Sequence, residues 1–435
     1  MKFITKLLAS ASLALVGVTA TTVVWPTKAE AQQNKNRAIT KNCPDGSIVP
    51  YRKKCPVFTV PPLPDPPPVV TPEPPPVVTP PPPGDPTWEP SPTLAGLAPI
   101  ASNFDFTRAL TATWGAGPGN VVGAFRMTCT AGHLNYDDPI VYPGQPGKAH
   151  LHQYFGNLTV DANSTYASLR GAGDSTCNIT GEGIAANRSG YWMPAMLDGV
   201  GNVVRPDYAS VYYKQRPITD PLIAPDSTHP SKEGIWTALP NGLKFIMGWN
   251  AVDPSKTAWG SFNFMCEGSG FSSGKFGNLE DALKDCPVGG TLYGTLIGPE
   301  CWDGKNLDSP DHMKHMAYMY NTNLGYFTCP TTHPYRIPTY QLTAAWTVDA
   351  NKNTWRLSSD SMAPGSKRGS TFHADFFEAW DPTVKTMWKD HCINQLLDCT
   401  GGALGNQYML KGATGSPWRA EPRLVPVPMN PHAGH

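Results

Sequence analysis

A proline-rich tract divides this chain of 435 residues and constrains its fold more than any other feature. Between Pro56 and Pro92 the unit PPPVVTP repeats, and prolines stand at a density that excludes both helix and sheet. Such a tract is extended and acts as a spacer. The sequence therefore predicts a short cysteine-bounded module over residues 32–55, a proline-rich linker over 56–93 and a globular domain over 94–435.

The N-terminal segment has the organisation of a secretory signal peptide. Two lysines precede an apolar run from Leu7 to about Val24, and the small-x-small pattern AEA ends at Ala31. We therefore expect a signal peptide over residues 1–31. No later segment approaches the roughly 18 consecutive apolar residues of a transmembrane helix. The mature chain is expected to be secreted, or to lie in the periplasm or cell envelope, without a transmembrane segment.

Ten cysteines agree with export, because disulfides persist in oxidising compartments. Cys43 and Cys55 precede the linker and could staple the short module, and Cys392 and Cys399 could close a small loop. The other domain cysteines are Cys129, Cys177, Cys266, Cys286, Cys301 and Cys329. Both regions hold an even number and can pair internally, although spacing does not give the connectivity. There is no C-x-x-C motif, which argues against a structural metal bound by cysteines.

Short β-type runs separated by glycine and proline dominate the globular region. The strand candidates span residues 124–131, 208–214, 243–250, 290–297 and 340–349. Only the segment that starts at Asn278 reads as an amphipathic helix. We predict a mainly β fold, a β-sandwich or jelly-roll-like domain with long loops, few short helices and disulfide staples.

Charge and aromatic content bear on the partner. The formal net charge is +0, so nothing attracts a polyanion and no nucleic acid partner is expected. Thirteen tryptophans and 16 tyrosines offer flat faces that suit sugar rings, although most aromatic side chains of a domain lie in its core. A polysaccharide or cell-wall glycan is the expected partner.

The first polar motif, GKAHLHQYFGN, places His150 and His152 two residues apart. In an extended strand both imidazoles lie on one face and Leu151 on the other. The polar face of an ordinary surface strand would explain the pair equally well. Gly144 completes the jelly-roll pattern G-x5-H-x-H, but QYFGN follows in place of the expected acidic ligand, which argues against a standard cupin.

The second motif, CWDGKNLDSPDHMKHMAY, packs carboxylates and histidines together. A turn at Ser309 could launch a helix on which His312 and His315 share a face, with Asp308 or Ser309 as its cap. A charged surface loop is the alternative. The third motif, STFHADFFEAWD, repeats the alternating geometry with His373 and Asp375.

The three motifs are expected to converge on one site. Its candidate catalytic residues are His150, His152, Asp308, Asp311, His312, His315, His373 and Asp375. Two kinds of chemistry stay open. A divalent metal could be held by His150, His152 and His312, or a carboxylate could orient a histidine for acid/base catalysis.

Specific reaction types make further demands on these residues. A glycosidase needs two carboxyls, for which Asp308, Asp311 and Asp375 are candidates, whereas a lyase would use a histidine as base. Residues near the motifs are candidates for substrate binding: Asp138, Tyr154, Trp302, Lys305, Asn306, Arg336 and Trp380.

These motifs, together with CTAGHLNYDDPIVYPG and CPTTHPYRIP and in this order, resemble the domain-of-unknown-function family nineteen-ninety-six. The resemblance covers about Phe125 to Cys392 and neither the cysteine module nor the linker. It implies a secreted fungal or bacterial protein, sometimes joined to carbohydrate-binding modules, and places the eight candidate catalytic residues in the motif set of the family. It implies no activity. The CPDGS module with its linker is similar to N-terminal segments of some bacterial envelope proteins.

Three functions remain open from the sequence. The first is an exported hydrolase or lyase that acts on a polysaccharide through a His/Asp site, because binding modules rarely gather so many titratable groups. The second is a non-catalytic envelope or extracellular protein that binds glycan. The third is a metal-dependent hydrolase or oxidase with a non-sugar substrate. The sequence names no cofactor beyond a possible divalent metal.

Overall fold

The structure, a computed structural model, describes residues 94–103, 110–112, 116–177, 186–410 and 422–432, and the backbone of 40–42 and 48–50. The chain divides into two units, Met1–Pro76 and Val77–His435. In the first unit β1 (Thr40–Asn42) pairs antiparallel with β2 (Ile48–Pro50). The expected signal peptide, the cysteines of the short module and the expected linker lie outside the described residues.

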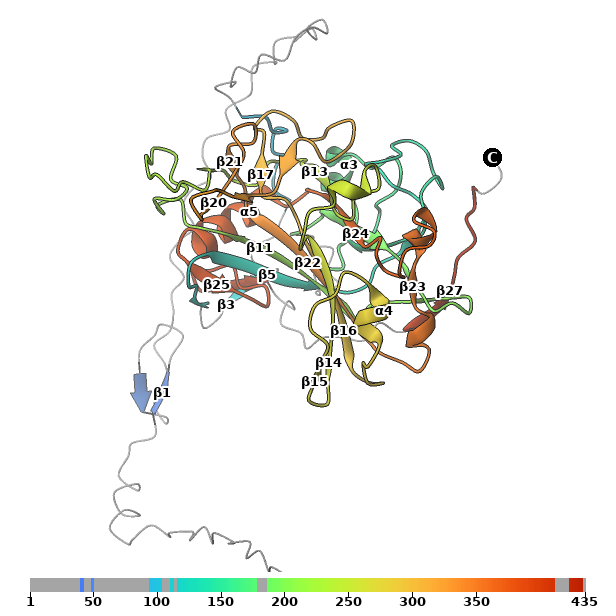
Figure 1. The fold of residues 1–435 in the computed structure, drawn as a ribbon. Helices are drawn as coiled ribbons and strands as arrows, with labels where there is room; N and C mark the ends of the chain where they lie inside the picture. Colours follow the sequence, from blue (N-terminus) through green and yellow to red (C-terminus); the bar gives the residue numbers. More distant parts are fainter. Residues whose placement is uncertain are drawn as a thin grey trace, which may run out of the picture. The chain divides into compact units, whose positions relative to one another are not determined.

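The second unit is built around two β-sheets. The larger has eight strands in the order β15-β14-β16-β22-β11-β5-β25-β4, and Figure 1 shows β14, β16, β22, β11 and β5 crossing the unit. Its strands are β4 (Gly117–Pro118), β5 (Gly123–Cys129), β11 (Tyr208–Gln215), β14 (Phe262–Gly268), β15 (Phe271–Ser272), β16 (Thr291–Ile297), β22 (Thr339–Thr347) and β25 (Leu397–Cys399). All five of the expected strands are present among the described residues.

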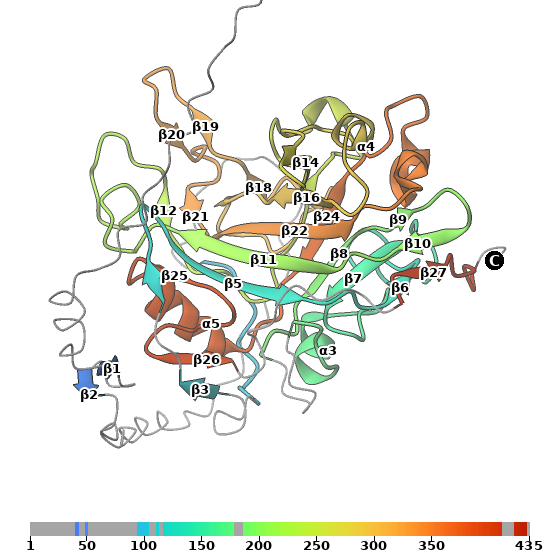
Figure 2. The ribbon, with the colours of Figure 1, turned by 90° about the horizontal axis from the view of Figure 1, so that it is seen from below.

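The smaller sheet has five strands in the order β13-β24-β8-β7-β6. Its strands are β6 (Leu134–Asn135), β7 (His152–Gly156), β8 (Gly190–Pro194), β13 (Lys244–Gly248) and β24 (His373–Phe377). Figure 2 shows β24, β8 and β7 beside β22, β11 and β5 of the larger sheet. Every residue of β7, β8 and β24 is buried, so this sheet is covered on both faces.

Aromatic side chains join the two sheets face to face. Tyr340 of β22 stacks on Phe376 of β24 with ring centroids 4.8 Å apart, and on Tyr191 of β8 at 5.5 Å. In β11 and β22 inward residues alternate with half-buried ones, as expected for strands with one face on the core. The prediction of a mainly β, sandwich-type fold is confirmed.

Short strands and helices complete the unit. The remaining strands are β3 (Leu110–Ala112), β9 (Met196–Leu197), β10 (Asn202–Val204), β12 (Ile235–Trp236), β17 (Cys301–Trp302), β18 (Met316–Ala317), β19 (Tyr320–Asn321), β20 (Phe327–Thr328), β21 (Tyr335–Arg336), β23 (Arg356–Leu357), β26 (Tyr408–Leu410) and β27 (Leu424–Pro426). The α-helices are α3 (Tyr166–Gly171), α4 (Leu279–Leu283) and α5 (Pro382–Trp388). Helix α4 is the one expected from the sequence, and the Asn278 side chain caps it by accepting from the Asp281 N–H at 2.9 Å.

Four disulfides staple the unit: Cys129–Cys177, Cys266–Cys286, Cys301–Cys329 and Cys392–Cys399. The last is the small loop that the spacing suggested. Disulfides of this number are typical of proteins that fold in oxidising compartments. In the part of the chain that the structure describes, no helix has the length and apolarity to cross a membrane.

The helix expected after Ser309 is absent, and that prediction is wrong. The segment runs instead along the free edge of β13, where the Lys244 and Ile246 N–H groups donate to the carbonyls of Leu307 and His312 at 2.9 and 3.2 Å. The Asp311 carboxylate accepts a hydrogen bond from the Lys314 N–H at 3.0 Å. A side chain that bonds to the backbone in this way stabilises a local turn in place of a helix. His312 has a φ of 57°, in the left-handed region that few residues other than glycine adopt.

Candidate functional site

The candidate site lies on the outer face of the smaller sheet. Alternation in β24 turns Ala374 and Phe376 to the core between the sheets and His373 and Asp375 to the outer face. The register between neighbouring strands determines which side chains lie side by side on this face. His373 lies opposite Gly248 of β13, and His152 of β7 lies opposite Pro194 of β8. One strand therefore separates His373 from His152, with a proline between them in place of a longer side chain.

Three imidazoles meet at this end of the sheet. The ring centroids of His150 and His152 are 4.2 Å apart, those of His150 and His373 5.1 Å, and those of His152 and His373 6.4 Å. One nitrogen from each ring lies within 4.8 Å of one from each of the others. Zinc–nitrogen bonds of about 2.0–2.1 Å place two ligands of one ion at most about 4 Å apart, so small ring rotations would complete a coordination sphere. We call these three residues the imidazole cluster.

Backbone carbonyls set the tautomer of two of the rings. The Nδ1–H of His152 donates to the Asp137 carbonyl at 3.1 Å, and that of His373 donates to the Thr371 carbonyl at 2.7 Å. The lone pair of each ring is then on Nε2, the arrangement that metal-binding histidines use. Within the described residues, Nε2 of His150 and of His152 is buried without a hydrogen-bond partner.

Two carboxyl groups adjoin the imidazole cluster. Oxygen atoms of Asp138 and Asp375 and a ring nitrogen of His152 lie within 4.8 Å of one another. Asp138 accepts from the N–H groups of Ile140 and Val141 at 2.8 and 2.9 Å and from the indole N–H of Trp192 at 3.4 Å. Both oxygens of Asp375 are buried without a partner among the described residues. An ionised carboxylate in that state is costly unless a proton or a cation neutralises it.

Burial disfavours every charge in this group of residues. It lowers the pKa of His152 to about 3, helped by nearby His373, and the pKa of His373 to about 4. Burial, with the two other rings, lowers the pKa of His150 well below its ordinary value. It raises the pKa of Asp138 to about 6, and with Asp138 it raises the pKa of Asp375 well above its ordinary value. The imidazoles are therefore neutral at physiological pH and able to donate lone pairs.

The second motif lies at the edge of this site. Nδ1 of His312 lies 2.8 Å from an Asp308 oxygen, and the Lys244 ammonium lies 2.9 Å from the other. The Ile246 N–H donates to the His312 carbonyl at 3.2 Å, and Ile246 lies opposite Asp375 across the β13–β24 pair. The expected metal set included His312, whereas the structure joins His373 to His150 and His152.

The other two polar residues of this motif have protein partners. Both ring nitrogens of His315 are used, with the Ser309 hydroxyl at 3.0 Å and the Lys244 carbonyl at 2.7 Å. The Asp311 carboxylate accepts from the Ser309 hydroxyl at 3.0 Å and from backbone N–H groups of its own turn. The structure thus gives His315 and Asp311 roles in holding the loop and does not bring them into the imidazole cluster.

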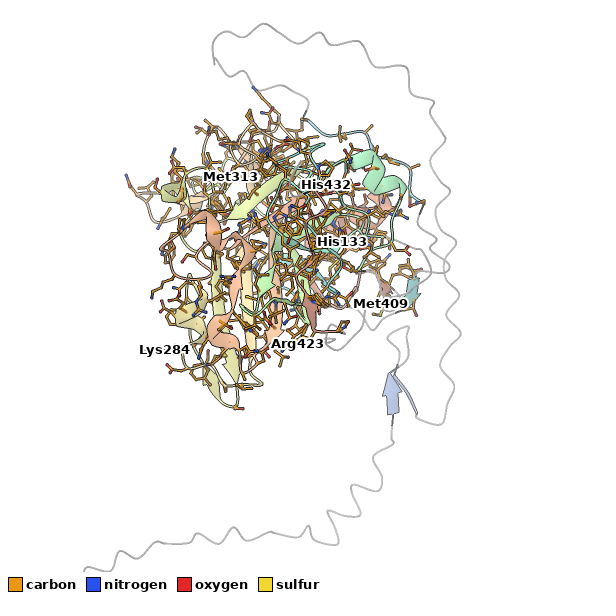
Figure 3. The ribbon with its side chains drawn as sticks, turned by 90° about the vertical axis from the view of Figure 1, so that its right-hand side faces the viewer. His133, Lys284, Met313, Met409, Arg423 and His432 are labelled. Carbon is orange, nitrogen blue, oxygen red and sulfur yellow. A yellow bond between two sulfur atoms is a disulfide. The ribbon has the colours of Figure 1, made fainter. Side chains whose placement is uncertain are left out.

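Of the candidate substrate-binding residues, only Asp138 and Tyr154 lie beside the imidazole cluster. The Tyr154 hydroxyl donates to the Asp137 carbonyl at 2.6 Å, and its ring stacks on His133, which Figure 3 labels. Trp302 and Trp380 are fully buried in the core and present no ring face to a ligand.

The remaining substrate-binding candidates lie in local structure of their own. Arg336 is buried in β21 and donates to the Ile337 carbonyl at 2.9 Å. Lys305 and Asn306 lie in a turn where their N–H groups donate to Asp303 at 2.8 and 2.9 Å. This turn lies between β17 and the second motif and contributes no side chain to the imidazole cluster.

Two neighbours of the site were not expected from the sequence. Trp249 is nearly buried, with its ring 6.2 Å from that of His373. Asp137 supplies the carbonyl that orients His152 and its side chain accepts from the Gly147 N–H at 2.7 Å. A signal for Trp249 existed, because it lies within the expected strand 243–250.

Comparison with known proteins adds a family but no activity. No curated protein and no solved structure matches the chain. The family model "Domain of unknown function (DUF1996)" matches residues 138–380, more than half of the chain, and this range contains both carboxyl groups and all three imidazoles of the site. The chain belongs to the DUF1996 family, as the resemblance of its motifs had indicated.

Proposed function

We propose that this domain is an exported metal-dependent enzyme that binds a divalent transition metal through His150, His152 and His373 and cleaves a polysaccharide. The observation that carries the proposal is the imidazole cluster, in which one ring nitrogen of each histidine lies within 4.8 Å of the others and the buried Nε2 atoms of His150 and His152 have no hydrogen-bond partner among the described residues. Imidazole ligands suit zinc, copper, iron or nickel better than calcium or magnesium. The metal would supply Lewis-acid chemistry, polarising a water molecule or a substrate oxygen.

The chain's own residues have separable roles in this proposal. Asp137 and Thr371 orient two imidazoles through their carbonyls. Asp375 lies beside His152 with both oxygens free, so it can bind the same ion or take up a proton from a reacting group. His150 is the least buried of the three histidines and marks the side from which a substrate reaches the site. Export and the polysaccharide substrate are supported by the signal-peptide pattern, the disulfides and the aromatic content.

Metal analysis tests the proposal directly. The purified mature chain should carry or take up close to one equivalent of zinc or cobalt, and His152→Ala and His373→Ala should lose it. His229→Ala is the matched control, because this histidine lies in an exposed loop outside the imidazole cluster. Wild-type protein that takes up no transition metal, or His152→Ala protein that retains it, contradicts the proposal. Release of reducing or unsaturated ends from a glycan panel, with and without chelator, then tests the reaction.

A second candidate function is metal-free acid–base cleavage by the carboxyl pair. It is favoured by the proximity of Asp138 and Asp375 and by the raised pKa of each, which burial causes. Glycosidases use two carboxyl groups in unequal environments. The two catalytic carboxyl groups of such enzymes are usually about 5 Å or more apart. Activity that survives chelation but is lost in Asp375→Asn would favour this candidate.

A further inference from the structure

Two loops near the candidate site expose aromatic side chains. Trp259 is fully exposed, at 101 %, in the loop between β13 and β14. Tyr320 and Phe327 of the β19–β20 hairpin are 50 % and 54 % exposed. Large apolar side chains gathered on exposed loops commonly mark binding surfaces. We call these three residues the aromatic triplet.

The first loop is anchored next to His373, and the hairpin is tied to the end of that loop. The first begins at Trp249, whose N–H donates to the Phe372 carbonyl at 2.9 Å, and ends at Ser261, whose carbonyl accepts from the Ile297 N–H at 2.8 Å. The hairpin follows Tyr318, whose hydroxyl donates to the Ile297 carbonyl at 2.8 Å. Ile297 therefore ties the two loops together, and the Cys301–Cys329 disulfide holds the far end of the hairpin. The first loop is thus continuous with the segment that carries His373, and the hairpin is fastened to the far end of that loop.

The charge of these loops restricts the partner. Residues 318–328 contain no charged side chain. The first loop contains one acid and one base, Asp253 and Lys256, which pair with each other at 3.1 Å. Anionic membranes and acidic polysaccharides are bound through unpaired lysines and arginines, and neither loop has one. An uncharged partner fits this surface.

The shape of the hairpin narrows the partner further. Tyr320 lies opposite Thr328 and Phe327 opposite Asn321, so the two rings project from different faces of the hairpin. A folded protein needs a continuous patch of about 800 Å² on each side. Two rings on different faces of a hairpin form no such patch, whereas an extended glycan that crosses the hairpin can stack one sugar on each ring.

We infer that Trp259, Tyr320 and Phe327 bind an uncharged polysaccharide and lead it to the candidate site. The inference rests on the proposed function for the destination of the chain and names the class of substrate. Binding on this surface needs no metal, so it can be measured separately from the proposed reaction.

Binding of metal-stripped protein to insoluble cellulose, chitin and starch granules tests the inference. Wild-type protein should bind at least one of these. Trp259→Ala should weaken that binding about tenfold, and Tyr320→Ala with Phe327→Ala by a similar factor. Val288→Ala is the matched control, since Val288 is 64 % exposed and lies outside both loops. Circular dichroism and zinc uptake should be unchanged in every variant.

Three outcomes would overturn the inference. They are wild-type protein that binds none of the three solids, loop variants that bind as wild type does, and capture by vesicles of phosphatidylcholine and phosphatidylserine in place of the glycans. Failure of the proposed function shows differently, as absence of metal uptake by wild-type protein while the solids are still bound.

Discussion

Gly248 lies directly opposite His373 across the antiparallel pair β13–β24. Its φ is +93°, and a Cβ added there would lie 2.9 Å from the His373 Cα and 2.6 Å from the Phe372 carbonyl oxygen. A side chain at this position would therefore push β24 away at the residue that contributes an imidazole. The absence of a Cβ on Gly248 keeps His373 in line with His150 and His152.

Gly248→Ala is expected to weaken zinc affinity by about tenfold or more, as displacement of a metal ligand's support typically does. Isothermal titration calorimetry measures the affinity, and thermal unfolding of the metal-free protein checks the fold. Gly365→Ala is the matched control: it has a similar φ of +87°, but a Cβ there meets nothing within 4 Å. Equal zinc affinity in the two variants would show that the Gly248–His373 contact does not shape the site.

The imidazole cluster also makes the stability of the metal-free protein depend on pH. Burial lowers the pKa of His373 to about 4 from an ordinary 6.5, so between these values the unfolded chain binds more protons than the folded one. The contribution of His373 to the free energy of unfolding is complete above about pH 6.5 and is lost as the pH falls toward 4. His373→Gln should therefore show a smaller fall in Tm on acidification from about pH 7 to about pH 5 than wild type does.

Asp138 changes the free energy of unfolding with pH in the opposite direction. Burial raises the pKa of this carboxyl to about 6 from an ordinary 3.8, so the folded state holds the extra proton between these values. Its contribution is present at low pH and is lost as the pH rises through about 6, and Asp138→Asn should make the fall in Tm on acidification larger. His229→Gln, in an exposed loop, serves as the control and should follow wild type. Parallel pH profiles for all variants would mean that neither group titrates differently in the folded state.

Local alternation allowed the sequence to predict the parts of the site that lie on strands. His373 and Asp375 keep to one face of β24 because a strand has a period of two. His150 and His152 were expected to share a strand face, but β7 begins at His152, so His150 meets the other rings from the segment before the strand. The helix that would have paired His312 with His315 was wrong, because contacts with the edge of β13 decided the conformation of that segment. Such contacts join residues about 60 positions apart and leave no local pattern. The burial of Trp302 and Trp380 could not be predicted either, because the local sequence around a tryptophan does not distinguish a core position from a surface position.

Arg170 of α3 and Asp381, the residue that caps α5, form a buried ion pair. Arg170 Nη2 lies 3.0 Å from an Asp381 oxygen, and both side chains are fully buried. Arg170→Met is expected to lower the free energy of unfolding by about 3–5 kcal/mol, because it removes the positive charge that neutralises a buried carboxylate. Asp381→Asn should act similarly, and the double variant should cost less than the two single losses together. Denaturant unfolding of the disulfide-intact protein measures each value.

A surface pair gives the control for this ion pair. Lys367 and Asp281 lie 2.7 Å apart with side chains 54 % and 36 % exposed. Lys367→Met should cost no more than about 1 kcal/mol, since exposed ion pairs contribute little. Two results would contradict this interpretation of the buried pair. One is that the losses of unfolding free energy in the two single variants add up in the double variant, and the other is that Arg170→Met loses as little as Lys367→Met.

The C-terminal strap, residues 422–432, braces the loop that leads to His150. Its strand β27 pairs with β10, and the Asn430 side-chain amide donates to the Gly147 carbonyl at 2.8 Å. Tyr136, beside Asp137 in that loop, donates its hydroxyl to the Pro428 carbonyl at 2.9 Å. Figure 3 labels His432 at the end of the strap. The strap thus holds both ends of the segment 136–147, which carries Asp137 and Asp138.

Asn430→Ala is therefore expected to loosen this segment without unfolding the domain. Amide hydrogen exchange should rise over residues 136–150, and zinc affinity should fall several-fold, by less than about tenfold, because the carbonyl that orients His152 becomes less well placed. Met429→Ala is the neighbouring control, since Met429 is 92 % exposed. If exchange rises in Asn430→Ala while zinc affinity stays at the wild-type value, the imidazole cluster does not depend on the strap and is held by the sheet alone.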